Sequence, residues 1–280
     1  MDKFFVRKFI LMIIAYMIIP SIIAIIFVLI NLQVPLYFFT IFEILIFLIP
    51  VFYLIKEAGG NPSDVLKINF NFSPKIIVFL LWGYVGVSLF NPGWQIIQGA
   101  LIPESFSSFY EDLLNKQVAQ QIELISIDNT LSFFYVLIFV AIIPAICEEV
   151  LFRGYFLQNL KIKNYSNLFI VLISSIIFSA IHLNLIAFVN LFVMGCFLGY
   201  ITIAVNSLVP AIIFHFFNNM TAVVMEAIKP GASVNENLYL TDNIFIGILL
   251  CVIGIIIMVI SYKKSLRISS LRLNNNIKQL

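Results

Sequence analysis

Two adjacent glutamates and an arginine lie inside a long apolar segment of the sequence. Glu148, Glu149 and Arg153 interrupt a run of mainly hydrophobic residues from Leu131 to Leu160. A charge near the centre of a lipid bilayer costs about 2.5–3.5 kcal/mol on insertion scales, so charges in membrane helices usually have partners and a function. This segment is therefore the first candidate for a site of chemistry.

The spacing predicts different surroundings for the two glutamates. On an α-helix, positions 149 and 153 are one turn apart on the same face, so the Glu149 carboxylate can pair with Arg153. Glu148 lies about 100° around the helix from Glu149, because an α-helix has 3.6 residues per turn. One carboxylate is thus neutralised and the other is free, and this division of roles is what acid–base catalysis requires.

The only two histidines of the chain lie in other apolar segments, each beside further polar groups. His182 follows Phe178 by one helical turn, and His215 precedes Asn219 by one turn. A lone histidine in a membrane helix often does no more than join two helices by a hydrogen bond worth about 0.6–2 kcal/mol. Separate structural roles for Glu148, His182 and His215 are nevertheless a less economical explanation than one shared site.

A carboxylate, two imidazoles and an amide are suited to hydrolysis of an amide bond. The carboxylate removes a proton from water, while hydrogen-bond donors stabilise the charge that develops on the carbonyl oxygen. The same residues resemble a His/His/Glu zinc set. Zinc is the less favoured alternative, because no His-Glu-x-x-His pair exists on one helix and Arg153 would compete with a cation. We expect no metal and no other cofactor.

Two further polar residues of apolar segments, Glu43 and Asn190, are interpreted as structural. Glu43 stands alone in its segment without an evident partner. Gly195 and Gly199 have the small-xxx-small spacing that favours close helix packing.

Composition places the chain in a membrane. Of its 280 residues 62% are hydrophobic and 11% charged, whereas soluble domains have roughly 45–50% and 25%. A membrane-spanning helix needs about 20 apolar residues. We therefore predict an all-α, polytopic helical bundle of about eight spans, at 9–31, 35–55, 76–100, 131–160, 166–183, 185–205, 207–228 and 243–262.

Basic residues predict the orientation of these spans. With eight spans, all but Lys116, Lys229 and Arg153 of the 16 Lys and Arg residues lie on the side of the two termini, Lys3 and Lys278 included. The positive-inside rule then places both termini in the cytoplasm. We expect a multi-pass protein of the cell membrane, with an Ile/Asn/Lys/Phe-rich composition that suggests a bacterial one. The basic tail 267–280 is expected to contact anionic lipid.

Smaller features divide the chain further. Pro20, Pro50, Pro92 and Pro144 should kink or break their helices, and Asn91-Pro92-Gly93 is expected to split the third span. The outer connection 101–130 forms either an amphipathic helix around 109–125 or a solvated loop. We divide the chain into N-terminal spans and outer loop (1–130), a catalytic core (131–228), and the last span with its tail (229–280).

Three motifs together resemble a known family. Glu148-Glu149-Val-Leu-Phe-Arg153, Phe178-x-x-x-His182 and His215-x-x-x-Asn219 occur in this order on successive apolar segments. This pattern resembles the CPBP family, the CAAX prenyl protease and bacteriocin-processing membrane proteases also called the Abi family. The resemblance covers about 131–228, and none of the key positions departs from it.

The resemblance implies a glutamate-dependent intramembrane endopeptidase without a catalytic metal. By similarity, Glu148 with help from His182 activates water, and His215 and Asn219 form the oxyanion site. Glu149 and Arg153 orient the site, and Phe178 packs beside His182. The implied partners are a peptide or lipidated-protein substrate and membrane lipid, with no nucleic acid, and the oligomeric state is open.

Two other functions remain as alternatives to a protease. One is a bacteriocin-immunity or scaffold protein in which the motif is structural, and the other is a proton-coupled transporter that uses intramembrane Glu and His. The predicted topology also contains a conflict. His182 would lie near the outer end of its helix and His215 about 12 Å from the cytoplasmic start of its own. For the two to meet, either the helices are tilted or offset, or the topology of this half is inverted, and the membrane face to which the cavity opens is left open.

Overall fold

A computed structural model describes residues 5–125, 127–228 and 243–277, and all regular structure in them is helical, which confirms the all-α class. Most segments are α-helices, and three are π-helices, in which each turn is wider by one residue. In chain order they are α1 (Phe5–Leu29), α2 (Tyr37–Glu43), π-helix η1 (Ile44–Leu48), α3 (Ile49–Glu57), α4 (Pro62–Val65), α5 (Lys75–Leu101), α6 (Glu104–Leu124), α7 (Thr130–Val136), π-helix η2 (Leu137–Ile142), α8 (Ile143–Glu149), π-helix η3 (Val150–Phe156), α9 (Leu157–Ile162), α10 (Asn167–Ile181), α11 (Phe188–Val205), α12 (Val209–Ile228) and α13 (Ile244–Ile277).

Seven helical segments of the described residues are long and apolar enough to cross a membrane. They are Phe5–Leu29, Tyr37–Glu57, Lys75–Leu101, Thr130–Ile162, Phe188–Val205, Val209–Ile228 and Ile244–Arg272. The remaining predicted span, 166–183, forms α10, which has only 15 residues. At 1.5 Å per residue, α10 is about 22 Å long, shorter than the roughly 30 Å hydrocarbon layer. A helix of this length that begins at one membrane surface ends within the apolar layer.

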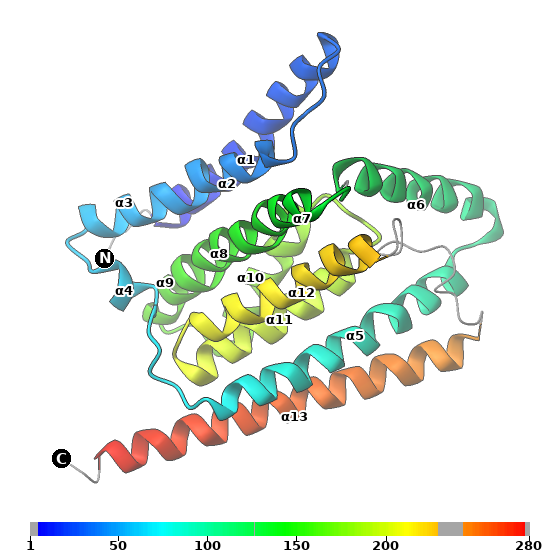
Figure 1. Ribbon diagram of the computed structural model, residues 1–280. Helices are drawn as coiled ribbons and strands as arrows, with labels where there is room; N and C mark the ends of the chain where they lie inside the picture. The colour runs from blue at the N-terminus through cyan, green and yellow to red at the C-terminus, as the bar shows by residue number, and fades with distance from the viewer. Residues whose placement is uncertain (1–4, 126, 229–242, 278–280) are drawn as a thin grey trace.

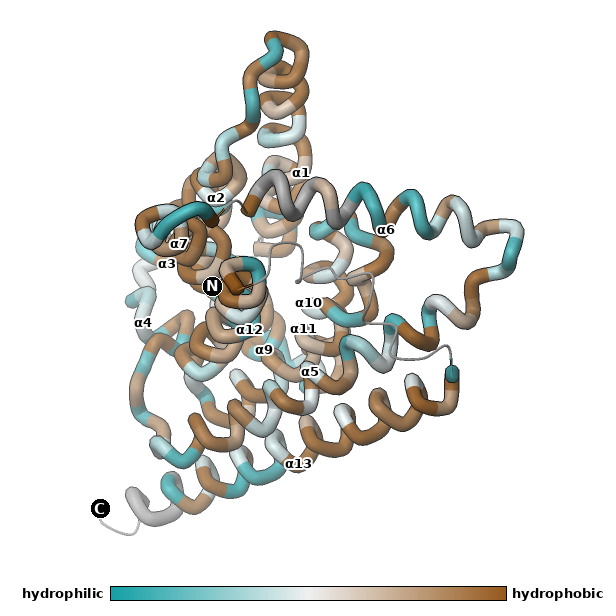
Figure 2. Tube along the Cα trace, turned by 45° about the vertical axis from the view of Figure 1, so that its right-hand side comes forward, coloured by the Kyte–Doolittle hydropathy of each residue, from teal (hydrophilic) through white to brown (hydrophobic). Residues whose placement is uncertain are grey.

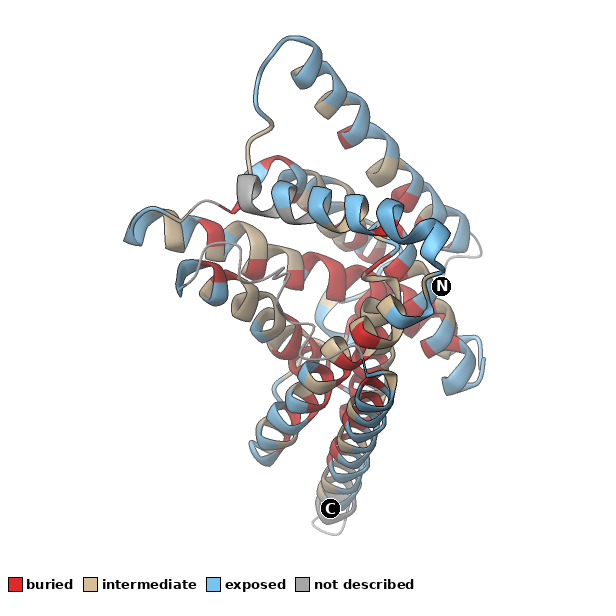
Figure 3. Cartoon of the chain, turned by 90° about the vertical axis from the view of Figure 1, so that its right-hand side faces the viewer, coloured by how far each residue is buried: buried red, intermediate tan, exposed pale blue. Residues whose placement is uncertain are grey.

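The helices form a central group with a long pair on each side (Figure 1). The segment from α7 to α9 packs with α10, α11 and α12 in the centre, where buried residues are concentrated (Figure 3). On one side lie α5 and α13, and on the other α1 forms a hairpin with the segment α2–α3. The start of α1 and the end of α13 lie at the same end of the bundle (Figure 1). That this end is cytoplasmic stays a prediction, and Lys3, Lys229 and Lys278 lie outside the described residues.

The four prolines have two different effects. Pro50 and Pro144 each follow a π-helical segment, η1 and η2, so the wider turn accommodates the ring where the backbone N–H is missing. Pro20 lies inside the continuous helix α1. The predicted split at Asn91-Pro92-Gly93 is wrong, because α5 runs unbroken from Lys75 to Leu101. Gly93 packs so closely against α13 that an added Cβ would lie 2.8 Å from the carbonyl oxygen of Gly247, and this contact supports the helix past the proline.

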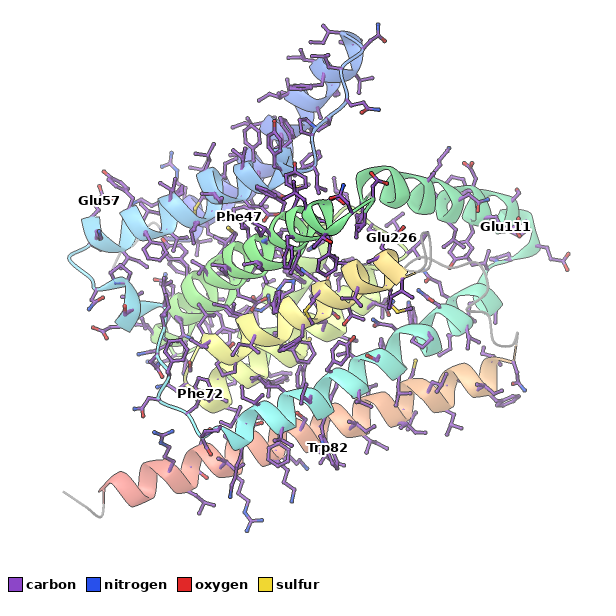
Figure 4. The ribbon with its side chains drawn as sticks, viewed as in Figure 1. Phe47, Glu57, Phe72, Trp82, Glu111 and Glu226 are labelled. Atoms are coloured by element: carbon purple, nitrogen blue, oxygen red, sulfur yellow. The ribbon has the colours of Figure 1, made fainter. Side chains whose placement is uncertain are left out.

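The outer connection is a helix rather than a loop. It forms α6, which is longer than the predicted 109–125 and begins at Glu104. Hydrophilic residues are frequent along α6, whereas α13 and α1 are predominantly hydrophobic (Figure 2). Glu111 points away from the bundle (Figure 4).

Candidate active site

The pair of Glu149 and Arg153 lies at the centre of the bundle. Both side chains are fully buried, and Arg153 Nη1 donates to Glu149 Oε1 at 2.6 Å. Arg153 Nη2 also donates to the carbonyl oxygen of Gly195 at 3.1 Å, and the guanidinium lies 4.6 Å from the ring centre of Phe178. A buried charge persists only when it is paired and hydrogen-bonded. The predicted one-turn pair is therefore present, and it links η3 to α10 and α11.

Glu148 faces both histidines. Its Oε2 atom lies 3.9 Å from His182 Nε2 and 3.8 Å from His215 Nε2. Glu148 and His215 are buried, whereas the side chain of His182 is 29% exposed. These separations exceed a direct hydrogen bond, and a polar contact of this length commonly holds a bridging water. Glu148 Oε2 is itself buried, without a hydrogen-bond donor among the described residues.

The other nitrogen of each imidazole determines what its Nε2 can do. His182 Nδ1 lies 2.7 Å from the carbonyl oxygen of Phe178, which can only accept, so Nδ1 carries the proton. His215 Nδ1 lies 2.9 Å from Glu149 Oε1 and likewise donates to it. In a neutral imidazole the remaining nitrogen is an acceptor. Both Nε2 atoms and Glu148 Oε2 are thus hydrogen-bond acceptors that point toward one another. A water molecule or an additional proton between them would supply the missing donor.

Contacts at the start of α12 explain how His215 reaches the same depth in the bundle as Glu148 and His182. The turn before α12 is bound by the segment after α4, because Leu208 N–H donates to the Lys67 carbonyl at 2.9 Å and Ser207 Oγ to the Asn69 carbonyl at 2.6 Å. Leu208 also packs against Gly154, where an added Cβ would lie 3.2 Å from its side chain. Gly154 lies six residues after Glu148, and Leu208 lies seven residues before His215. Because the two helices run antiparallel and touch at Gly154 and Leu208, Glu148 and His215 lie at the same depth.

The short helix α10 brings His182 to the same depth. Its N-terminus is capped by Ser166 Oγ, which accepts from Phe169 N–H, and His182 is the residue that ends it. Because α10 has only 15 residues, its last residue lies inside the bundle rather than at the far surface. Phe178 contacts the His182 ring at a centroid distance of 4.8 Å, which is the packing that the sequence predicted.

Asn219 is set apart from the other candidates. It lies one turn beyond His215 on α12, is half-buried, and its Nδ2 donates to the carbonyl oxygen of Val140 at 3.4 Å. No recorded contact joins it to Glu148 or to either histidine. Its amide stands beside η2, one helical turn from the place where the three acceptors meet.

One contributor to the site was missed from the sequence, and one polar residue interpreted as isolated has a partner. Gly195 was predicted only to pack helices, which it does, since an added Cβ would lie 3.1 Å from Ser175. Its carbonyl also binds Arg153, a role that sequence spacing does not reveal. Glu43, interpreted as an isolated structural residue, is buried and accepts a hydrogen bond from Tyr16 OH at 3.1 Å. Its interpretation as a residue without a partner is therefore wrong, whereas nothing contradicts its structural role.

Replacing Gly195 by valine tests whether this close approach matters. The added atoms would meet Ser175 and Arg153 Nη2, which lie 3.1 Å and 3.2 Å from an ideal Cβ. Overpacking of this kind costs about 1–3 kcal/mol. We expect a lower melting temperature in detergent and reduced activity for Gly195→Val, and a smaller effect for Gly195→Ala. A valine variant with unchanged melting and activity would contradict the tight fit.

Within the described parts of the chain, no group of three or more His, Cys, Asp or Glu side chains has metal-binding spacing. The acceptors of Glu148, His182 and His215 are nevertheless of the kind that zinc prefers. This donor set suits either a bridging water or a zinc ion.

The fold is that of a multi-pass, all-α membrane protein, and its centre contains a buried cluster of glutamates and histidines. Residues 130–221, from α7 into α12, match the family described as type II CAAX prenyl endopeptidase Rce1-like. This match confirms the resemblance found in the sequence, and the matched segment contains all seven candidate residues. It supports an intramembrane CAAX-type endopeptidase in general. No curated protein and no solved structure matches the chain.

Proposed function

We propose that this protein is an endopeptidase that hydrolyses a peptide bond of a membrane-associated peptide or protein with a water activated by Glu148. The observation that carries the proposal is the convergence of Glu148 Oε2 with the Nε2 atoms of His182 and His215 at 3.8–3.9 Å. A water held there would donate one hydrogen to the carboxylate and the other to an imidazole. Its lone pair would then point away from all three, toward a substrate carbonyl.

In the proposed reaction Glu148 transfers one proton from the attacking water to the leaving amine. As the water oxygen bonds to the carbonyl carbon, Glu148 takes the water proton, helped by the acceptor Nε2 of His182. The carbonyl oxygen becomes negatively charged. When the C–N bond breaks, the amine leaves with the proton that Glu148 had taken, and Glu148 is again ionised. His182 is the most exposed of the three, which agrees with a position next to the substrate.

His215 and Asn219 are proposed to stabilise the oxyanion. His215 can donate through Nε2 only when it is doubly protonated, because Nδ1 already donates to Glu149. The Glu149 carboxylate, which is paired with Arg153, faces Nδ1 of that imidazole. The Asn219 amide would turn from Val140 to the substrate oxygen, since hydrogen bonds of a catalytic site often tighten only in the substrate complex.

The substrate is proposed to be a prenylated C-terminal tail, a leader or pheromone peptide, or a membrane-embedded segment. The family match supports the first of these, and a farnesylated CAAX peptide is therefore the first probe. A pool of membrane peptides from cells that lack this protein is the second, because peptides that accumulate there include its substrates. Cleavage of either by the purified protein in phospholipid vesicles tests the proposal.

Chelation separates glutamate chemistry from zinc chemistry. We expect cleavage by the purified protein to survive dialysis against a strong chelator, with kcat/KM changed less than about twofold, because Glu148 can itself accept the water proton. Exposed Glu111→Gln protein, treated in the same way, serves as the reference. Activity that is lost on chelation and restored by zinc alone would contradict the metal-free mechanism.

The transporter alternative makes a different prediction. A proton relay through Glu148 would produce proton-coupled flux across vesicles without any cleavage of the peptide pools. A scaffold would produce neither flux nor cleavage, and its function in cells would survive Glu148→Gln.

A further inference from the structure

A cavity lies at the end of the bundle where α1 begins and α13 ends (Figure 1). Its volume is about 550 Å³, within the range of roughly 300–1,000 Å³ that is usual for ligand sites. Its walls come from the segment 69–73 before α5, residues 204–206 at the end of α11, and the segment 266–272 of α13. Phe72, which marks the first of these walls, is labelled in Figure 4. None of the seven candidate site residues lines this cavity.

The cavity lies at the level of a membrane surface. The spanning segment of α11 ends at Val205, which is a wall residue, and that of α5 begins at Lys75, directly after another wall. On α13, Lys263 and Lys264 follow the apolar stretch and come just before the wall segment 266–272. Lipid headgroups occupy about 5–8 Å on each side of the hydrocarbon layer, so a ligand in the cavity would lie among them.

The cavity wall is polar and basic. Its polar side chains include Asn71, Asn206, Ser269, Ser270 and Arg272, and none of the described residues that line it is acidic. Hydroxyl, amide and guanidinium groups can all donate hydrogen bonds, and the oxygens of an ionised phosphate group accept them. A cation would find no carboxylate in this wall and would be repelled by Arg272. The wall therefore suits an anion.

Arg272 is held in position for such a contact. Its Nη2 donates to Asn71 Oδ1 at 3.1 Å, which joins α13 to the segment before α5. This bond uses one of the five N–H groups of the guanidinium and occupies the amide oxygen of Asn71. The other N–H groups of the two side chains can donate to a ligand. Arginine commonly binds a phosphate group through two parallel hydrogen bonds, which fix the geometry of the contact.

An exposed apolar row on α13 leads from the hydrocarbon layer to the cavity. Val252, Val259 and Leu266 are 47%, 43% and 43% exposed, and Leu266 also lines the cavity. Residues seven apart lie on nearly the same face of a helix, because two turns contain 7.2 residues. An acyl chain can lie along this row while its headgroup occupies the cavity, whereas a free phosphate would leave the row unused.

We propose that this cavity binds the phosphate group of an anionic membrane lipid, with Arg272 and Asn71 as donors and an acyl chain along the apolar row of α13. Positive charge at a membrane surface attracts anionic lipids, and basic residues are frequent at this end of the bundle, where Lys56 and Lys161 lie in the last turns of α3 and α9. The proposal assigns a defined site to an attraction that the sequence predicted only for the basic tail as a whole.

A bound lipid would also steady the start of α12. Asn69 and Asn206 both line the cavity, and Asn69 Nδ2 donates to the carbonyl oxygen of Asn206 at 3.1 Å. The next two residues, Ser207 and Leu208, make the hydrogen bonds that set the depth of His215. A ligand in the cavity therefore ties α13 to the start of α12, and its binding should raise the melting temperature.

Melting of the full chain in a neutral detergent tests the site, with phosphatidylglycerol or phosphatidylcholine of the same acyl chains added. The anionic lipid should raise the melting temperature more than the zwitterionic one. We expect Arg272→Gln to increase the phosphatidylglycerol concentration at half effect by about thirtyfold, as is typical when a hydrogen bond to a charged group is lost. Arg267→Gln removes the same charge from an exposed position of α13 outside the cavity wall and should change this concentration by about fivefold at most.

A substitution without any change of charge separates the cavity from general attraction. Ser270→Leu adds a branched apolar side chain to the wall at an exposed position, so the fold should be retained. We expect it to weaken the effect of phosphatidylglycerol by about tenfold or more. Ser21→Leu, at an exposed serine of α1 far from the cavity wall, should leave the effect unchanged.

Four results would overturn the inference. They are equal effects of Arg272→Gln and Arg267→Gln, an unchanged response of Ser270→Leu, equal stabilisation by the two phospholipids, and equal stabilisation by glycerol phosphate, which would identify a free phosphate as the ligand. Should Arg272→Gln fail to fold, Arg272→Lys keeps the charge without the paired hydrogen bonds and must still weaken the effect. These measurements need no peptide substrate, so their outcome is independent of whether the chain is a protease.

Discussion

Replacing Glu148 by glutamine should lower kcat by about 10²–10⁴-fold, the range that a general base contributes, while the protein stays folded. Glutamine has nearly the same shape but cannot accept the proton of water. Glu148 Oε2 has no hydrogen-bond donor among the described residues. The substitution therefore removes no hydrogen bond of this atom that would hold the folded protein together. The measurement is cleavage of a farnesylated CAAX peptide or of the accumulated membrane peptides, with melting in detergent as the test of folding.

Exposed Glu111 provides the matched control for this substitution. Glu111→Gln removes a carboxylate of the same size from α6, where it points away from the bundle (Figure 4), and should leave kcat unchanged. A Glu148→Gln protein that retained wild-type turnover would exclude Glu148 as the base and with it the proposed mechanism.

Replacing Arg153 by methionine should destabilise the protein by about 3–5 kcal/mol, because it leaves the buried carboxylate of Glu149 without its counter-charge. It also removes the bond to the Gly195 carbonyl and the contact with Phe178. The loss is measured as a lower melting temperature in detergent and a lower yield of folded protein.

The double variant Glu149→Gln/Arg153→Met distinguishes charge from packing. Replacement of both charged partners avoids the unpaired charge, so the double variant should be more stable than Arg153→Met alone. Activity should stay low, because His215 loses the carboxylate that accepts from its Nδ1 and orients the ring. If the double variant melts no higher than the single one, the destabilisation comes from lost packing instead.

The local part of the site could be predicted from the sequence. The pairing of Glu149 with Arg153 follows from helical spacing alone, since residues four apart on a helix are neighbours. The contact between Phe178 and His182 was implied by the family resemblance, and the two rings are in contact in the structure. The convergence of Glu148 with the two histidines was expected from shared chemistry and from the family resemblance, and the distances of 3.8–3.9 Å agree with it.

Features that depend on contacts between distant segments could not be predicted. The depth of His215 is set by hydrogen bonds from the Leu208 backbone N–H and the Ser207 hydroxyl to carbonyl oxygens of residues 67–69, far away in sequence. The unbroken α5 depends on the close approach of Gly93 to α13, which outweighs the proline before it. Glu43 was interpreted as isolated because its partner Tyr16 is 27 residues away on another helix.

The most direct test of the central claim is an experimental structure in which solvent is visible, with anomalous scattering recorded at the zinc edge. The account predicts a water within hydrogen-bond distance, about 2.7–3.2 Å, of both Glu148 Oε2 and an imidazole Nε2, without anomalous signal. An anomalous peak about 2.0–2.2 Å from these same three atoms would identify a zinc enzyme. Either that peak, or imidazole rings that point away from Glu148, would contradict the account.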